Sequence, residues 1–173
     1  MAIEIERRFL FDQFAVLENP EAWSVSRIVQ GYLFASNGTV CRARRESGIH
    51  GIGSKNTLTI KKDIDASSCH EIETKVTDDE MTELLSICSS QVSKVRYHLK
   101  GHLDPEELWT VDVFTGPALS GLCIAELEAA NEDVEIGDST LIPGCGKEIT
   151  GEKKYSNYAL SLAVEAFRKE NQK

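Results

Sequence analysis

The stretch "EIERRFL", residues 4–10, places charged side chains at alternate positions near the start of the chain, with apolar residues around them. This alternation is typical of a β-strand. Because alternate residues of a strand share a face, Glu4, Glu6 and Arg8 project to one side. Taken alone, such a row is the solvated face of a half-buried strand. The rest of the chain indicates whether this row belongs to a site.

Charged residues recur two positions apart, often with like sign, in several other segments that read as strands. The basic residues are Arg42 with Arg44, Lys94 with Arg96, and Lys61; the acidic ones are Glu71 with Glu73, Glu126 with Glu128, and Asp112. Like charges this close repel unless water or counterions relieve them. Six or more such strands, segregated into acidic and basic, indicate a lining around a charged ligand.

A polyphosphate with a divalent cation fits such a lining. Arg and Lys bind phosphate oxygens, and carboxylates bind hard cations such as Mg²⁺ or Mn²⁺. The four histidines show no HExxH or similar spacing, so a zinc site is not expected. The loop "GIHGIGSKN" lacks the GK[ST] ending of a phosphate-binding P-loop and is better read as a hairpin connection.

The predicted fold is a single α+β domain over residues 1–173. Strands are expected at residues 3–11, 28–35, 39–46, 56–63, 69–76, 92–100, 107–114 and 122–129. Asn37-Gly38 is the hairpin signal between the second and third. One helix follows a capping box at Thr77 and Glu80, and another covers residues 157–169. We expect eight antiparallel strands closed into a barrel, with a charged tunnel inside and both helices packed outside.

Composition excludes several classes of protein. The net charge of −9 argues against general nucleic-acid binding, which needs a net basic surface or stripe. No apolar run approaches the ~20 residues of a membrane-spanning helix, and the start lacks a secretory signal. Five scattered cysteines without a CxxC motif argue against a disulfide framework. A cytoplasmic protein is expected, and the sequence leaves a homodimer open.

The ordered set of motifs resembles the CYTH superfamily, the triphosphate tunnel metalloenzymes. "EIERRFL" is similar to its N-terminal ExExK motif, and the likeness continues through "QGYL", "CRARR", "LTIKK", "HEIE", "SKVRY", "VDVFTG", "AELE" and "GKEITGEKKYSNYALS". It covers nearly the whole chain. The family fold is an eight-stranded antiparallel barrel with helices outside, in agreement with the predicted strands.

The resemblance implies roles for individual residues. The implied metal ligands are Glu4, Glu6, Glu126 and Glu128, with Glu152 as a further candidate. The implied triphosphate contacts are Arg8, Arg42, Arg44, Lys61, Lys94 and Arg96. Glu71 and Glu73 match a family acidic strand that positions metal-bound water or balances the basic side. Lys94 and Tyr32 are the expected catalytic residues, and a buried aromatic residue at a strand end is the plain alternative for Tyr32. Arg8 replaces the usual motif Lys, which preserves phosphate contact better than proton donation.

Small bacterial inorganic tripolyphosphatases are the nearest branch in this reading, which predicts metal-dependent hydrolysis of tripolyphosphate. The alternatives are a class IV adenylyl cyclase that makes cyclic AMP from ATP, a thiamine or nucleoside triphosphatase, and a non-catalytic polyphosphate-binding module. We expect no aromatic pair beside the charged residues. Trp23 is expected in a loop, and Trp109 is out of phase with Asp112, so it should face away from the tunnel.

Overall fold

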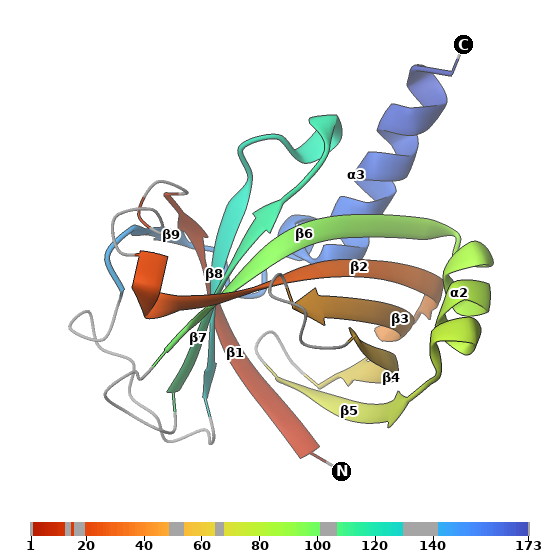
Figure 1. Cartoon of the computed structure of the whole chain (residues 1–173), viewed down its shortest axis with the longest axis horizontal. Helices are drawn as coiled ribbons and strands as arrows, with labels where there is room; N and C mark the ends of the chain where they lie inside the picture. Colours follow the sequence, from red (N-terminus) through yellow and green to blue (C-terminus); the bar gives the residue numbers. More distant parts are fainter. Residues whose placement is uncertain are drawn as a thin grey trace.

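The computed structural model describes residues 2–12, 15, 20–48, 54–64, 68–100, 107–129 and 142–172. These residues form one curved antiparallel sheet of nine strands and two α-helices (Figure 1). The strands follow the order β5-β4-β3-β2-β6-β7-β8-β1-β9. Their bounds are β1 Ala2–Phe11, β2 Trp23–Ser36, β3 Thr39–Gly48, β4 Ser54–Asp63, β5 Ser68–Lys75, β6 Ser90–Leu99, β7 Glu107–Phe114, β8 Cys123–Ala129 and β9 Cys145–Glu148.

The prediction of a closed eight-stranded barrel is wrong. The sheet has nine strands, and β1 pairs with β5 and with β8 along different parts of its length. Residues 2–5 pair with β5, whereas residues 5–10 pair with β8. The two ladders share only Ile5, so the curved sheet brings its edge strand β5 against β1 over only a short stretch. Beyond that point β9 pairs with Phe9 and Phe11 of β1. The four residues of β9 carry no alternating apolar pattern, which explains why this strand was not predicted.

Local sequence signals place the β2–β3 hairpin correctly. Asn37 and Gly38 both have positive φ, 50° and 70°, as a two-residue turn between antiparallel strands requires. The predicted strand at residues 28–35 is longer in the structure, because β2 begins at Trp23. The expectation that Trp23 lies in a loop is therefore wrong, and its side chain is buried.

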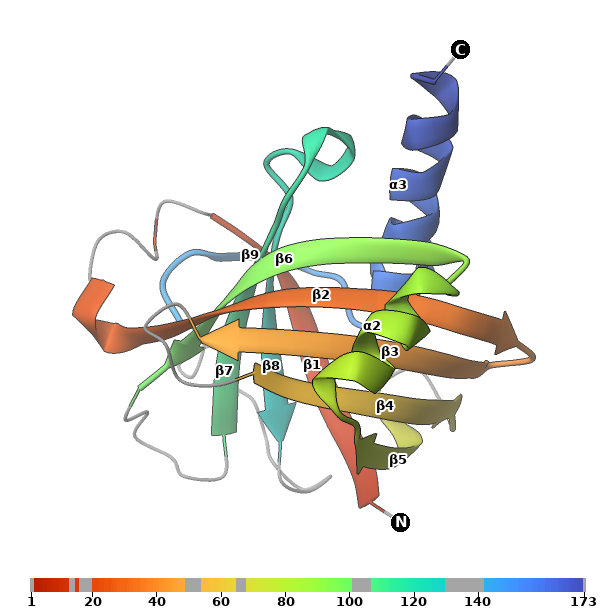
Figure 2. The same cartoon turned by 45° about the vertical axis from the view of Figure 1, so that its right-hand side comes forward.

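The two α-helices lie on different parts of the sheet (Figure 2). α2 (Asp78–Ser86) begins at the predicted capping box, in which Thr77 and Glu80 exchange hydrogen bonds, and packs on β2, β3 and β4. α3 (Asn157–Glu170) is capped by Ser156, whose hydroxyl accepts from the Ala159 amide, and packs on β6. The short 3-10 helices are η1 (Pro20–Ala22), η2 (Pro117–Leu119) and η4 (Lys153–Tyr155). In the described part of the chain, neither helix is long and apolar enough to cross a membrane.

Two apolar clusters fix the wall formed by β1, β6, β7 and β8. The first packs Trp109 and Phe9, whose ring centroids lie 6.0 Å apart, with Trp23 and residues of β8. Trp109 belongs to this core and does not line the central cavity, which confirms that it faces away. The second cluster packs Leu160 of α3 against Phe114 and Ile124. The first cluster lies on the face opposite the charged rows, whereas the second lies on the same face as those rows, since Phe114 and Ile124 are two residues from Asp112 and Glu126.

Trp109→Ala tests the first cluster. Removing this ring, which is 2% exposed, should lower the free energy of unfolding by about 3–5 kcal/mol, since the cavity that remains adds to the lost burial. Urea denaturation followed by circular dichroism measures the change. Phe34→Ala is the control, because Phe34 is 50% exposed and its loss should cost far less. Equal losses for the two variants would contradict the assignment of Trp109 to the core.

Candidate active site

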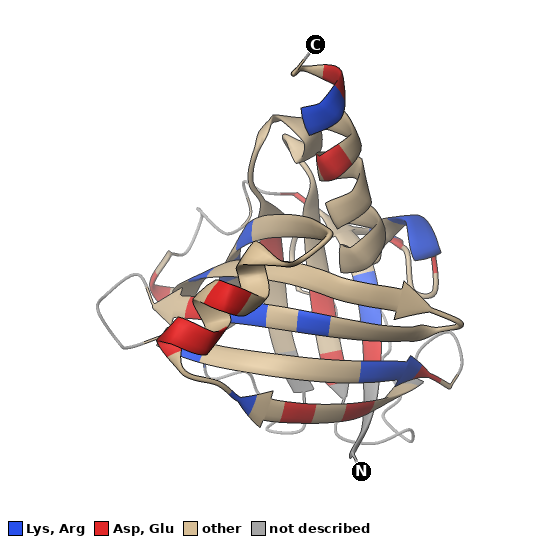
Figure 3. Ribbon diagram, turned by 90° about the vertical axis from the view of Figure 1, so that its right-hand side faces the viewer, with Lys and Arg blue, Asp and Glu red and all other residues tan. Residues whose placement is uncertain are grey.

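A cavity of about 710 Å³ lies inside the curve of the sheet, closed on one side by the start of α3. Its wall includes charged residues from β1, β3, β4, β5, β6 and β8. Figure 3 shows basic residues along β3 and acidic residues along β5. The alternation of each strand points these residues to one face, and the curvature turns that face inward.

β3 forms the basic wall. Arg42 Nη2 donates to Thr59 Oγ1 at 3.1 Å, and Arg44 Nε donates to Gln30 Oε1 at 3.2 Å. Burial, and next the neighbouring Arg42, lowers the pKa of Arg44 to about 10, so it remains charged at neutral pH. Arg42 Nε is buried without a hydrogen-bond partner among the described residues. A buried cationic donor with unused capacity favours an anionic ligand.

Glu71 and Glu73 lie on β5, next to β4, and their negative charges pair with lysines of β4. Lys61 Nζ is 2.7 Å from Glu71 Oε2, and Lys55 Nζ is 3.3 Å from Glu73 Oε1. Glu73 also accepts from the Thr59 hydroxyl at 3.3 Å. Burial alone would raise the pKa of Glu73, but Lys55 and Thr59 more than offset this and lower it. These carboxylates therefore neutralise one side of the cavity, whereas Arg42 and Arg44 have no carboxylate within ion-pair distance on the neighbouring strands.

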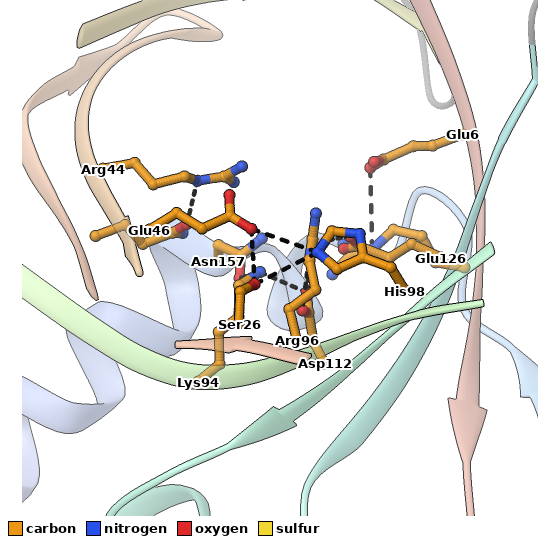
Figure 4. A network of polar contacts seen from close by, with 12 residues as sticks. Glu6, Ser26, Arg44, Glu46, Lys94, Arg96, His98, Asp112, Glu126 and Asn157 are labelled. Carbon is orange, nitrogen blue, oxygen red and sulfur yellow. Dashed lines mark hydrogen bonds and ion pairs between the residues drawn. The ribbon is translucent and has the colours of Figure 1, made fainter. Parts of the chain in front are cut away.

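The opposite wall contains a buried charge network centred on Asp112 (Figure 4). Asp112 is fully buried and accepts from Lys94 Nζ and, through both carboxylate oxygens, from Arg96 at 2.7 and 2.6 Å. Arg96 also donates to Glu126, and Arg8 Nε lies 3.2 Å from the other oxygen of Glu126. Burial would raise the pKa of Asp112, but Arg96 and Lys94 hold it well below its usual value.

Lys94 lies behind this wall. Its side chain is fully buried and is bound by Asp112 and, at 3.2 Å, by Asn157 of α3. Burial lowers its pKa to about 7, although Asp112 opposes the shift. An amine with this pKa can transfer a proton near neutral pH. To reach a ligand in the cavity, Nζ has to leave Asp112.

Glu6 and Glu128 are the paired carboxylates that face the cavity. They are direct cross-strand partners in the β1–β8 ladder, and both line the cavity. Directly opposite residues have Cβ atoms about 4.5–5.5 Å apart, a spacing at which two carboxylates repel unless cations lie near. This donor pair suits a hard divalent cation that keeps water and phosphate oxygens as its other ligands. No group of three or more metal-binding side chains occurs among the described residues.

The structure brings most of the predicted site residues together, but not all. Arg8, Arg42, Arg44, Lys61, Arg96, Glu6, Glu126, Glu128 and Tyr32 line the cavity. Glu4 lies in β1 opposite Cys69, and its side chain is outside the described part of the structure. Glu152 is not part of the cavity wall and is paired with Lys147 and Lys154.

The expectation of no aromatic pair beside the charged residues is wrong. Tyr32 and Tyr158 both line the cavity, with ring centroids 5.2 Å apart in an edge-to-face arrangement. Burial raises the pKa of Tyr32 to about 12, so the phenol remains protonated at neutral pH. Tyr158 comes from the first turn of α3, and no local signal in the sequence links this helix to the cavity.

Three further residues were not predicted and form a cluster at the edge of the network (Figure 4). Glu46 accepts from the Ser26 hydroxyl at 2.6 Å and lies 3.3 Å from Nε2 of His98. The His98 contact, and next Ser26 after the opposing effect of burial, lowers the pKa of Glu46 to about 2. Glu46 extends the alternating row of Arg42 and Arg44 on β3. Its spacing in the sequence could therefore have predicted that it shares their face.

The chain is similar to known proteins over nearly its full length. It is 33% identical over 168 residues to an inorganic triphosphatase of Nitrosomonas europaea. The alignment covers 93% of this chain and 98% of that protein. A crystal structure of an inorganic triphosphatase matches with a TM-score of 0.61 at 29% identity, over 94% of this chain and 96% of the other. A Pyrococcus horikoshii protein, 18% identical, shares the fold with a TM-score of 0.62 over 96% and 99% of the two chains. No family model matches the chain.

Asp112→Asn tests the buried network. The neutral amide leaves Lys94 and Arg96 without their shared counter-charge, and the free energy of unfolding should fall by about 3–5 kcal/mol. Urea denaturation at pH 7 measures the change. Asp63→Asn is the control, because Asp63 is exposed at the end of β4. A loss for Asp112→Asn no larger than that of the control would show that the network contributes little to stability.

Proposed function

Because this chain belongs to the CYTH superfamily of triphosphate tunnel metalloenzymes, we propose that it is a metal-dependent triphosphatase and that inorganic tripolyphosphate is its preferred substrate. The observation that carries this proposal is the cavity wall, in which Glu6 faces Glu128 and Arg42 has a buried Nε with no hydrogen-bond partner in the described part of the chain. A bare anion site would need the arginines alone. The paired carboxylates add a place for a cation.

In the proposed mechanism, Glu6 and Glu128 would hold the cation, with Mg²⁺ or Mn²⁺ as the candidates and Glu126 and Glu4 as its further ligands. When bound, such an ion would neutralise phosphate charge and activate water for attack on a phosphoanhydride. Glu126 is the less available of the lining carboxylates, since Arg96 and Arg8 already bind it.

The arginines supply most of the binding in this proposal. Arg42, Arg44 and Arg96, with Lys61 and Arg8, surround the triphosphate from opposite walls and stabilise the negative charge on its oxygens during phosphoryl transfer. Tyr32 remains protonated at neutral pH, so its hydroxyl acts as a hydrogen-bond donor to a phosphate oxygen and not as a base. Lys94 is the second candidate for proton transfer, after release from Asp112.

The setting is proposed to be a reducing compartment such as the cytoplasm. All five cysteines are free in the structure. Cysteines that remain unpaired fit a compartment in which thiols stay reduced. The net charge of −9 repels free tripolyphosphate at long range, so the metal complex of the substrate is the favoured incoming species.

A substrate panel tests the proposed reaction. The purified chain, freed of metal with a chelator and then given Mg²⁺ or Mn²⁺, should release phosphate from tripolyphosphate faster than from ATP or thiamine triphosphate at equal concentration. The reason is that charged side chains from six strands line the cavity, and these suit phosphate and a cation. Phosphate release and cyclic AMP are scored in parallel. Cyclic AMP as the main product of ATP would identify a cyclase, and tight polyphosphate binding without turnover would identify a binding module.

Arg42→Gln tests the basic wall. Loss of this charge should weaken tripolyphosphate binding by about 1.5–3 kcal/mol, the range for hydrogen bonds to charged groups. Isothermal titration calorimetry without metal measures the affinity independently of turnover. Arg27→Gln is the matched control, because Arg27 is an exposed residue of the neighbouring strand β2 and does not line the cavity. Equal affinities for both variants and the parent chain would show that β3 is only a solvated face.

A further inference from the structure

Gln30 lies behind the cavity wall, between Arg44 and Tyr32, which both line the cavity, and it has no part in the mechanism above. It belongs to β2, is fully buried, and is the direct cross-strand partner of Arg44. Its side chain joins two proposed substrate contacts: Oε1 accepts from Arg44 Nε at 3.2 Å, and Nε2 donates to the Tyr32 hydroxyl at 2.9 Å. A buried amide with both ends bound has a defined orientation.

The chemistry of Arg44 fixes that orientation. A guanidinium group has only donors, so the atom of Gln30 that faces Arg44 has to be the carbonyl oxygen. The amide nitrogen therefore faces Tyr32, and the nitrogen of an amide is a donor only. The opposite orientation would place N–H groups of Gln30 against N–H groups of Arg44, at the cost of a buried unsatisfied donor on each side.

The direction of these two hydrogen bonds determines which further hydrogen bond the Tyr32 hydroxyl can form. Its oxygen accepts the hydrogen bond from Gln30, so its own proton is not used in that contact. Among the hydrogen bonds of the described residues, the Tyr32 hydroxyl acts only as an acceptor. The Tyr32 side chain lines the cavity beside Arg42 and Arg44, where the proposed phosphate oxygens would lie.

We propose that Gln30 is a positioning residue that, held by Arg44, directs the Tyr32 hydroxyl proton into the cavity, where it donates to a phosphate oxygen of the substrate. This role rests on the proposed triphosphatase function. Arg44 thereby has two effects: it binds the anion by its charge, and it sets the polarity of the Gln30 amide. The sequence "QGYL" separates Gln30 and Tyr32 by one residue, which places both on the same face of β2.

Gln30→Glu reverses the polarity with almost no change in shape. A carboxylate accepts from Arg44 and also from the Tyr32 hydroxyl, so the phenol proton turns toward residue 30 and away from the cavity. Gln30→Met removes both hydrogen bonds and adds no charge, and it serves as the second variant should the carboxylate disturb folding. Gln172→Glu, at an exposed position after α3, is the control for the added negative charge.

The first readout needs no activity. The tyrosine Fermi doublet in the Raman spectrum distinguishes a phenol that accepts a hydrogen bond from one that donates, and subtraction of the Tyr32→Phe spectrum isolates Tyr32 from the other three tyrosines. We expect the Tyr32 phenol to accept a hydrogen bond in the parent chain and to donate one in Gln30→Glu. In Gln30→Met it should lose the hydrogen bond that it accepts from residue 30. A Tyr32 doublet that is the same in the parent chain and in a folded Gln30 variant would overturn the proposal.

The second readout is steady-state hydrolysis of tripolyphosphate. Gln30→Glu should lower kcat about tenfold, the loss expected for one hydrogen bond made in the transition state, and Gln172→Glu should not. In a Tyr32→Phe background the Gln30→Glu change should lower kcat much less than it does in the parent chain, and the loss that remains measures the effect of its charge on Arg44. Full additivity of the two changes in kcat would contradict a role through Tyr32. If the parent chain hydrolyses no triphosphate, the proposed function fails, and the Raman result alone decides the role of Gln30.

Discussion

The buried carboxylate of Asp112 is the interaction on which the cavity depends. It neutralises Lys94 and Arg96, which project from the same face of β6 only two residues apart, and it lies directly opposite Arg96 in the β6–β7 ladder. Removing three charges from water is costly, and only mutual contact at short range repays the cost. Both carboxylate oxygens of Asp112 accept hydrogen bonds from Arg96. They hold the guanidinium in a position from which it also donates to Glu126. The rigidity of this wall follows from its charge balance.

The cavity walls differ in how their charges are compensated. Lysines of β4 meet glutamates of β5, and the cations of β1 and β6 meet Asp112 and Glu126. Arg42 and Arg44 of β3 are bound by the neutral side chains of Thr59 and Gln30 instead. If the charges of the cavity served stability alone, Arg42 and Arg44 would be expected to pair with carboxylates as well. Among the described residues, neither arginine has a carboxylate within ion-pair distance, which is typical of a binding site, where local stability is lower and a ligand supplies the missing interaction.

Local patterns in the sequence predicted the parts of this arrangement that depend on near neighbours. The Asn37-Gly38 hairpin, the capping box of α2 and the inward rows of like-signed charge follow from turn chemistry, capping and the two-residue period of a strand. The brief strand β9 and the role of Tyr158 were missed. Both depend on contacts between distant segments, since β9 pairs with β1 and Tyr158 packs on Tyr32. The early start of β2 at Trp23 was missed for the same reason: the residue pairs with Leu99 of β6, and its ring packs edge-to-face on Tyr97 of that strand.

The sequence by itself determined which residues share a face, because the period of a strand is a property of the backbone, and it thereby determined the charged character of the site. Only the tertiary structure decided how the sheet curls and which charges remain without a counter-charge. The structure is a single sheet of nine strands instead of the closed eight-stranded barrel that strand counting predicted, with β1 staggered between β5 and β8 and with β9 beside it. Likewise, Gln30 reads as an ordinary polar residue in the sequence. It acquires a fixed polarity only because the β2–β3 register places it opposite Arg44, whose guanidinium can donate hydrogen bonds but cannot accept them.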